Sequence, residues 1–507
     1  MGEDRSTGRM FEGLKRALWS DPARRPMTEA IPIIDDAFAQ RILDLAMRIA
    51  EALLSVGASA KDTVVAALRV TTAYGLRSVH VDITFNSVTM SDHRDGTGDP
   101  ITLMRVVRSQ AADHAKLQRL QGLVDDIDGG MSLNDATLRF HAIRRMPFLY
   151  RTAVTVVAKA LLAVAVALMF GGGWVVLGGA FVAGLGVALA QEGLAKARVP
   201  AFFSQIAGAV VVTFVGLVFA WLASMDVPGF VGARPSLIVS SGIVLMLAGV
   251  AIVSSAQDAI DGFSLTAGGR ILDLVVMTIG VVLGIVVGLE VASHLGFSFE
   301  VPSEAIPFGS VAGQLAGALI IAVAVALMNG AGIRIILVSA ALAGIAWGAS
   351  YLVSSFGDTP TAAGAFGGAL VASLVGSMLA GRLHVPSVAV TTAAIIPMVP
   401  GSAVFRGLLG VVESGTDVDH LMVAFDSLFQ AAMIGLALAA GATLGVFLGT
   451  PMRIRLRGRR VARTAAPRAS GAGGTSVIDI IPTRPIPTDA DDEAHTLTRP
   501  MDTAGEG

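Results

Sequence analysis

The residues best suited to chemistry lie in two long apolar segments of the chain. They are Ser255, Gln257, Asp258, Asp261, Pro400, Gly401, Ser402 and Arg406. Charges within such a segment are costly to bury and often carry function. Pro and Gly release backbone amides and carbonyls from a helix, and these groups bind small solutes where the backbone is broken. The set suits a zwitterion, whose carboxylate needs amides or a cation and whose ammonium needs carbonyls or an acid.

Two interpretations of the charges remain open. In the first, Asp258 and Arg406 line a solute pathway, with Asp261 as a weaker candidate. In the second, both acids are solvated loop charges and Arg406 extends to the membrane interface. Lys159 and Glu290 also fall within apolar segments, but each is near a predicted end, which favours the interfacial interpretation for them.

A second kind of chemistry is suggested by His, Asp and Ser residues in the N-terminal third. The residues are Ser59, His80, Asp82, Ser87, Ser91, Asp92, His93, Asp95 and Asp99. A Ser-His-Asp hydrolase uses these types. However, no GxSxG pattern surrounds any of the serines, and HxD alone is not a metal motif. A solvated turn beside a strand is therefore the favoured interpretation.

Composition excludes several classes of site. The chain has no Cys, which excludes disulfides, thiolate metal sites and cysteine nucleophiles. No Walker A motif is present, so neither ATP nor any other cofactor is expected. The formal net charge of −2 gives no reason to expect nucleic-acid binding.

The elements that must position these residues begin with a small α+β domain at residues 31–148, after a leader at residues 1–30. Helical spacing relates Ile42, Leu45, Ile49 and Leu53, and Gly57 is placed to end that helix. Ser59 and Ser132 resemble capping residues of two later helices, and a third helix runs through Leu117 to Ile127. Alternation predicts strands at 77–91, turned at Asn86-Ser87, and near 101–107.

A long stretch of low charge follows this domain. Residues 152–450 contain 8 Lys or Arg and 13 Asp or Glu, which is about 7% charge against roughly 25% in soluble domains. Ten apolar segments in it approach the roughly 20 residues that a helix needs to cross hydrocarbon. They lie near 152–170, 174–190, 203–224, 236–256, 273–293, 308–328, 333–353, 362–381, 387–410 and 425–449. The predicted fold class is an α-helical polytopic membrane protein with ten transmembrane helices.

Loop charges predict the orientation of these helices. With a cytosolic N-terminus, the inner ends receive Arg144, Arg145, Arg151, Lys196, Arg198, Arg270, Arg334, Arg382, Arg453, Arg455, Arg457, Arg459 and Arg460. The outer ends receive only Arg234 and Arg406, with Glu300, Glu304, Asp358, Glu413, Asp417 and Asp419. This is the positive-inside bias of the cytoplasmic membrane, and it places both termini in the cytosol. Residues 451–507 are expected to form a basic, then disordered, cytosolic tail.

The apolar part of the chain repeats itself. The heptapeptide AVAVALM occurs at 163–169 and again at 322–328, with glycines after both copies. Weaker matches follow at similar offsets, such as Val215-Gly216 with Val375-Gly376. The copies, residues 149–300 and 301–450, each hold five segments, and an odd number inverts the second copy in the membrane. Inverted repeats are typical of alternating-access transporters, which bind substrate near midplane at the repeat interface.

Four stretches of the chain resemble the threonine/serine exporter family of bacterial inner-membrane carriers. They are GASAKDT at 57–63, the strand VHVDITFNSVTMS at 79–91, QDAIDG at 257–262 and IPMVPGSAVFR at 396–406. The likeness covers about residues 35–450. Family members often carry Pro-Gly in the first repeat as well as the second, where this chain has Ala248-Gly249.

The resemblance implies a carrier that exports L-threonine and L-serine by proton antiport. Its partners would be the amino acid, protons and the lipid bilayer, with glycine-rich helices that suit packing within the bundle or in a homo-oligomer. Two alternatives remain: a membrane-anchored hydrolase or sensor that uses the N-terminal domain, and a passive small-solute channel.

Overall fold

The computed structural model of the chain describes residues 35–93, 100–108, 110–230, 233–246, 249–294, 308–356, 359–383, 385–413 and 417–464. The expected leader, most of the expected tail, and the loop acids Asp95, Asp99, Glu300, Glu304 and Asp358 lie outside these ranges.

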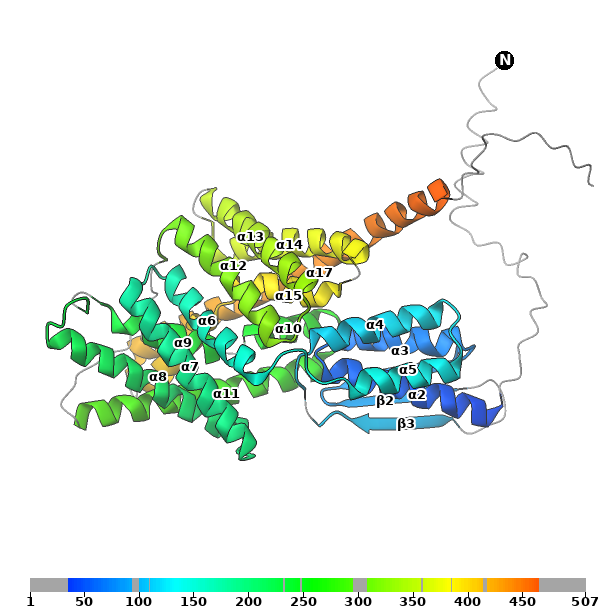
Figure 1. Ribbon diagram of the computed structural model, residues 1–507, viewed down its shortest axis with the longest axis horizontal. Coiled ribbons are helices and arrows are strands. Elements are labelled where there is room, and N and C mark those ends of the chain that lie inside the picture. The colour runs from blue at the N-terminus through cyan, green and yellow to red at the C-terminus, as the bar shows by residue number, and fades with distance from the viewer. Residues whose placement is uncertain are drawn as a thin grey trace, which may run out of the picture. The chain divides into compact units, whose positions relative to one another are not determined.

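Residues 35–148, called the N-terminal region below, form four helices and a sheet around one apolar core. Its elements are α2 (Asp36–Ser55), α3 (Ala60–Ala73), β1 (Val79–Thr84), β2 (Ser87–Asp92), β3 (Ile101–Val106), α4 (His114–Asp128) and α5 (Leu133–Arg145). The strands form an antiparallel sheet in the order β1-β2-β3. Figure 1 shows the helices packed over one side of the sheet.

The predicted helix caps are confirmed, and the predicted turn is shifted by one residue. At the start of α3, the Ser59 hydroxyl accepts a hydrogen bond from the backbone N–H of Asp62. At the start of α5, the Ser132 hydroxyl accepts one from the N–H of Asp135. Gly57 ends the first helix with a φ of 92°, which suits glycine. The hairpin turn is Phe85-Asn86, because β2 already begins at Ser87. Phe85 has a φ of 52°, an unusual value for a bulky side chain.

His114, the first residue of α4, makes the N-terminal region sensitive to acid. Its side chain is buried, and burial lowers the pKa of His114 from 6.5 to about 4. The folded region therefore holds a neutral imidazole, whereas the unfolded chain binds a proton below pH 6.5. We expect the region to lose about 2 kcal/mol of stability as the pH falls from 6.5 to 5. Above pH 7, titration of His114 should not change the stability. His114→Gln should abolish that loss, as measured by urea-dependent proteolysis of the purified full-length chain.

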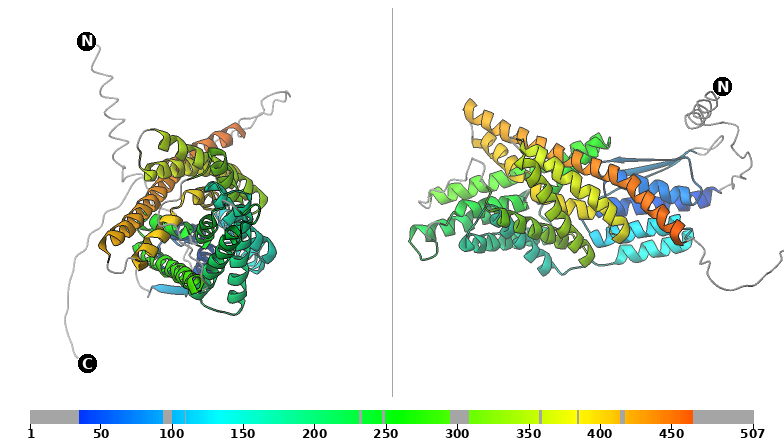
Figure 2. Two further views of the ribbon diagram at one scale, coloured as in Figure 1. Left: turned by 90° about the vertical axis from the view of Figure 1, so that its left-hand side faces the viewer. Right: turned by 90° about the horizontal axis from the view of Figure 1, so that it is seen from above.

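In the described part of the chain after the N-terminal region, eight helices are long and apolar enough to cross a membrane. The number of candidate spans rises to ten if each of two bent helix pairs is one span. The first five spans are α6 (Thr152–Met169), α7 (Trp174–Lys196), α8 (Ala201–Ser224), the pair α9 (Pro235–Met246) with α10 (Gly249–Ile260), and α11 (Ser264–His294). The second five are α12 (Val311–Met328), α13 (Ile333–Ser355), α14 (Thr361–Leu383), the pair α15 (Ser387–Ile395) with α16 (Gly401–Glu413), and α17 (Val418–Thr464). These match the ten predicted segments in order. Figures 1 and 2 show the N-terminal region at one end of this bundle.

One of the two bent pairs falls where the sequence predicts broken backbone. The pair α15 and α16 bends by 54° between Met398 and Gly401, at Pro400 and directly after a short 3-10 turn, Ile396–Met398. The pair α9 and α10 bends by 42° between Met246 and Ala251, although the sequence there lacks the Pro-Gly of other family members. One difference concerns α17, which continues through the basic sequence to Thr464 instead of ending near residue 449.

Glycines let the third and last helices of each half approach closely. On α11 these are Gly280, Gly284 and Gly288, where an added Cβ would lie 2.4–3.1 Å from atoms of α8. On α17 they are Gly441, Gly445 and Gly449, which meet the backbone or side chains of α14 in the same way. Small residues spaced by four are the usual means of close helix packing in membranes.

Gly284→Ala is expected to destabilise the bundle. The new Cβ would lie 2.4 Å from the carbonyl oxygen of Ile206, which is backbone and cannot rotate away. Overpacking of this kind costs about 1–3 kcal/mol. Gly268→Ala, on the same helix with no atom within 4 Å of the new Cβ, should be neutral or gain about 0.5–1 kcal/mol. Thermal aggregation of the detergent-solubilised variants measures the difference, and equal midpoints would contradict it.

Candidate functional site

Asp258 lies in the last turn of α10 and is 1% exposed. One carboxylate oxygen is 2.6 Å from Nη1 of Arg270, on the next helix α11. The carboxylate also accepts a hydrogen bond from the backbone N–H of Ala60, at the start of α3. The turn at Gly262 reverses the chain and brings α11 back beside α10. Asp258 is therefore a buried, paired charge, and the solvated-loop interpretation is wrong for it.

Asp261 lies one turn further along, at the end of α10. Its carboxylate is 2.7 Å from Nζ of Lys61, and the Asp261 side chain is 15% exposed. Ser255 is buried and its hydroxyl donates to the carbonyl of Ala251 within the helix, whereas Gln257 is half-buried. The structure thus gathers both acids at the end of α10, where the N-terminal region meets α10 and α11.

The second break places backbone groups and a cation on the other bent pair. The carbonyl of Pro400 accepts from the N–H groups of Ala403 and Val404, so α16 begins directly after Pro400. Pro400 and Gly401 are buried, and Ser402 and Arg406 are half-buried on α16. Among the described residues, no carboxylate lies within ion-pair distance of Arg406.

The two bent pairs pack against each other. Val239, Ile243 and Met246 of α9 share an apolar cluster with Phe405 and Leu409 of α16. In a second cluster, Val253 of α10 joins Ile395 of α15, with Met398 and Val399 from the break packed against it. Asp258 and Arg406 are not ion-paired with each other, however, because the partner of Asp258 is Arg270.

The sequence did not single out Arg270 as part of a site. It also did not single out a row of hydrogen-bonded side chains that begins at Lys159. Lys159 is half-buried and its Nζ is 3.4 Å from Oε1 of Gln191, whose amide is 3.4 Å from Gln205. These contacts join α6, α7 and α8. A signal for Arg270 did exist: a helix, a Gly turn and a second helix place residues 258 and 270 beside each other on antiparallel neighbours.

The hydrolase alternative finds only part of its machinery in the described residues. The Ser91 hydroxyl is 3.1 Å from Nε2 of His93, and the His93 ring stacks edge-on with His80. No carboxylate contact to the His93 ring is found among the described residues, and Ser91 also bonds to Thr102. No group of three His, Asp or Glu side chains in the described part of the chain is arranged to hold a metal.

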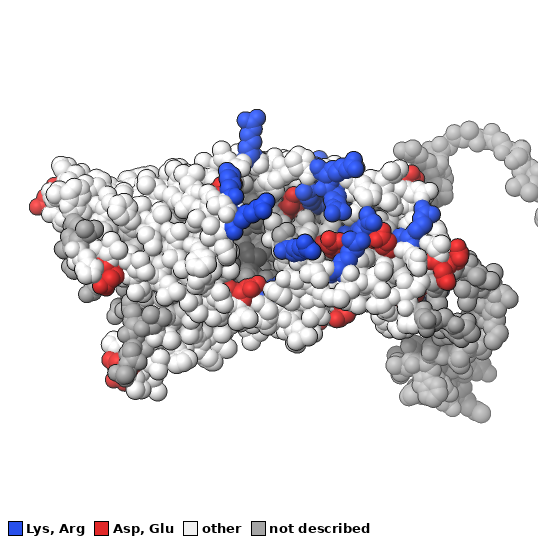
Figure 3. All heavy atoms as spheres, turned by 90° about the horizontal axis from the view of Figure 1, so that it is seen from below, with Lys and Arg blue, Asp and Glu red and all other residues white. Residues whose placement is uncertain are grey.

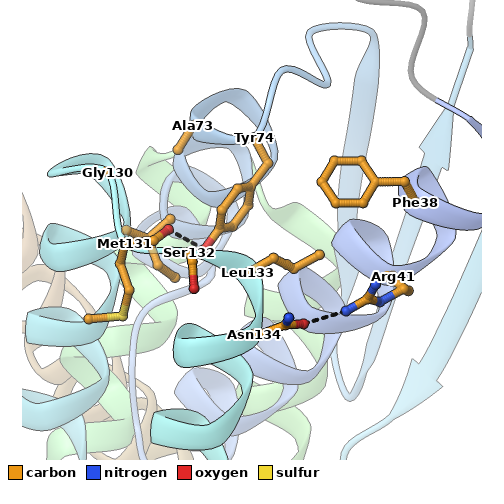
Figure 4. A pocket seen from close by; sticks show the side chains of 10 residues that line it. Phe38, Arg41, Ala73, Tyr74, Gly130, Met131, Ser132, Leu133 and Asn134 are labelled. Atoms are coloured by element: carbon orange, nitrogen blue, oxygen red, sulfur yellow. Dashed lines mark hydrogen bonds between the residues drawn. The ribbon is translucent and has the colours of Figure 1, made fainter.

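A shallow cavity of about 410 Å³ lies on the N-terminal region between α2, α3 and α5. Figure 4 shows its lining, in which Arg41 donates to Asn134 and the Tyr74 hydroxyl donates to the carbonyl of Met131. Burial raises the pKa of Tyr74. Because these polar groups already bind one another, the cavity is a weaker candidate than the broken helices.

Charged side chains are unevenly distributed on one face of the molecule. Figure 3 shows a broad surface almost free of charge, with Lys and Arg gathered where it meets the N-terminal region and acidic residues at its opposite end.

Comparison with known proteins identifies the family. A family described as "Putative threonine/serine exporter" matches residues 44–292, and one described as "Threonine/Serine exporter, ThrE" matches residues 314–448. A "Probable threonine/serine exporter" of Mycobacterium tuberculosis is 32% identical, covering 89% of this chain and 86% of that protein. A "Threonine/serine exporter" of Corynebacterium glutamicum is 29% identical, covering 83% and 85%. No solved structure matches. With this similarity along nearly its whole length, the chain belongs to the threonine/serine exporter family.

Proposed function

We propose that the chain is a secondary active transporter that exports L-threonine and L-serine across the cytoplasmic membrane by proton antiport. The observation that carries the proposal is Asp258, a buried carboxylate that ends one broken span while that span packs against a second broken span. Broken helices with a buried ionisable group are the usual binding and coupling elements of secondary transporters.

In this mechanism Asp258 is the coupling group. Ionised, it is held by Arg270 and by the N–H of Ala60. A proton that enters down its gradient neutralises the carboxylate and removes its attraction to the guanidinium. Arg406 and the backbone N–H of Ser402 bind the substrate carboxylate, beside Pro400 and Gly401, whose own N–H donates to the carbonyl of Val399. Asp261, Gln257 and Ser255 contribute polar groups to the path of the ammonium.

The repeat is part of the proposal, as two inverted five-span halves. The identical heptapeptides lie in α6 and α12, which pack directly together through Ala165, Val166, Ala324 and Val325. In both halves the fourth span is bent. The three glycines of α11 and the three of α17 lie 161 residues apart, close to the offset of 159 between the heptapeptides. Such agreement supports a duplicated unit that can alternate between two states.

The proposed orientation places the N-terminal region and both termini in the cytosol. Lys196, Arg198 and Arg334 are exposed at helix ends on that side, as the positive-inside rule requires. The amino acid then leaves the cell while protons enter.

The test is threonine efflux from cells loaded with a threonine dipeptide. Cells that produce the chain should export threonine against its gradient, and an uncoupler should stop the uphill export. Export that runs only downhill, with or without the uncoupler, would support the channel alternative and refute antiport.

A further inference from the structure

The N-terminal region contacts both halves of the membrane bundle, and these contacts differ in kind. On the first half it meets the corner between α10 and α11, here called the α10–α11 corner (residues 258–270). On the second half it meets the loop between α12 and α13 (residues 329–332). Because the core of the N-terminal region is continuous, any motion of one half relative to the other must break or stretch one of these contacts.

The contact with the α10–α11 corner is polar and built on the start of α3. The N–H of Ala60 binds Asp258, and Nζ of Lys61 is 2.7 Å from Asp261, with the Lys61 side chain 56% exposed. A helix N-terminus carries partial positive charge, which favours the ionised form of Asp258. Charge therefore holds the corner to α3, through Asp258 and Asp261, the two acids of the proposed pathway.

The β1–β2 turn completes this contact. The N–H of Phe85 donates to the hydroxyl of Thr266 at 3.0 Å, and that hydroxyl donates to the carbonyl of Ile83 at 3.2 Å. The Phe85 ring lies so close to Gly269 that an added Cβ would be 2.6 Å from it. Phe85 has the left-handed φ of 52°, a strained conformation that the docked corner holds in place.

The contact with the second half lies where the N-terminal region leads into α6. The Phe148 ring lies against Gly330. This position requires glycine, because its φ is 65° and an added Cβ would lie 2.8 Å from the Phe148 ring. The Tyr150 hydroxyl donates to the carbonyl of Ala331 at 2.7 Å, and the N–H of His114 donates to that of Asn329 at 2.7 Å. Phe148 and Tyr150 directly precede α6, and α6 packs against α12, which ends at this loop, so this contact cannot separate far while α6 and α12 stay packed.

We propose that the N-terminal region is a built-in brace that holds the two halves in one state and releases the α10–α11 corner in each transport cycle. This inference rests on the proposed function. The corner is the contact that gives way because it is exposed at Lys61, strained at Phe85 and dependent on the charge of Asp258. When Asp258 is neutralised, the attraction of the α3 N-terminus and of Arg270 is lost, and coupling and release become one event.

Cysteine crosslinking tests the brace directly, because the chain has no cysteine of its own. In Phe85→Cys with Gly269→Cys, the two β-carbons lie close together, because an added Cβ at Gly269 would be 2.6 Å from the Phe85 ring. Oxidation should join the region to the corner and reduce threonine export at least tenfold, with recovery on reduction. The control pair, Ser91→Cys with Thr102→Cys, replaces two hydroxyls 2.9 Å apart on the neighbouring strands β2 and β3 within the N-terminal region. Its oxidation should leave export unchanged.

Several outcomes overturn the brace. If the oxidised Phe85→Cys, Gly269→Cys protein exports as fast as its reduced form, the region is a static scaffold. Equal inhibition of the control pair would remove the role of the corner. Export by the reduced protein is the reference. A wild-type chain that exports no threonine would instead count against the proposed function.

A second measurement uses a single cysteine and no crosslink. Thr266 is fully buried beneath the β1–β2 turn, so the single variant Thr266→Cys should react slowly with a membrane-permeant maleimide at rest and severalfold faster during threonine export. Thr71→Cys, fully buried in the core of the N-terminal region, is the matched control and should not change. Equal labelling of the Thr266→Cys variant with and without export would refute the release.

Discussion

Asp258→Asn is expected to lower threonine export about 100-fold, because the buried carboxylate that binds and releases the proton is lost. The pair with Arg270 has a 2.6 Å contact and side chains only 2% and 15% exposed. Removal of one partner of a buried ion pair also lowers folding stability by about 3–5 kcal/mol, since the other charge stays buried without compensation. Each 1.4 kcal/mol corresponds to roughly a tenfold change in an equilibrium constant. Efflux from dipeptide-loaded cells measures export, and thermal aggregation in detergent measures stability.

The double variant Asp258→Asn with Arg270→Gln separates folding from function. Removing both charges leaves no uncompensated ion, so most of the stability lost in Arg270→Gln alone should return. Export should stay as low as in Asp258→Asn, because neither neutral side chain couples to the proton gradient. Asp273→Asn, an exposed acid on the same helix as Arg270, is the matched control and should export normally. Full export by the double variant would make the pair purely structural.

Local sequence patterns predicted those elements that depend on neighbouring residues. The serine caps, the strands and the broken backbone at Pro400 all follow from the conformational limits of a few consecutive residues. Long apolar runs likewise predicted the candidate spans, which number ten when each bent pair is counted as one, because a helix satisfies its own backbone inside a membrane. The turn was misplaced by one residue because Phe85, a residue that rarely adopts left-handed φ, is held there by Thr266 of a distant helix.

Most of the charge pairing could not be predicted from local patterns. Arg270 was interpreted as an orientation charge, and its pairing with Asp258 follows only once the turn at Gly262 is known to fold α11 back beside α10. Lys61 and Asp261 are 200 residues apart, and no periodicity links two groups from different elements. The contact between the two bent helix pairs needed only their apolar faces. The choice of ionic partner depended on which side chains the packed helices brought within reach.

Arg406→Ala is expected to raise the half-saturating threonine concentration for export about tenfold or more. A guanidinium that is half-buried in α16 loses hydration, and among the described residues no carboxylate compensates it. The carboxylate of the substrate supplies that charge in the proposed mechanism, and a charge-assisted hydrogen bond contributes roughly 1.5–3 kcal/mol. Because the effect lies in binding, the maximal rate should fall less than the apparent affinity. Transport into inside-out vesicles over a range of threonine concentrations separates the two quantities.

Conservative and distant replacements decide whether Arg406 binds substrate or only anchors α16. Arg406→Lys keeps the charge without the planar fork, so it should recover part of the affinity. An interfacial anchor would tolerate lysine fully, and alanine would then alter protein yield without altering half-saturation. Arg234→Gln removes an exposed cation just before α9 and should leave both quantities unchanged. If Arg406→Ala behaves like Arg234→Gln, the substrate carboxylate must bind elsewhere. The N–H of Ser402 is then the next candidate, because the N–H groups of Gly401, Ala403 and Val404 already donate to Val399 and Pro400.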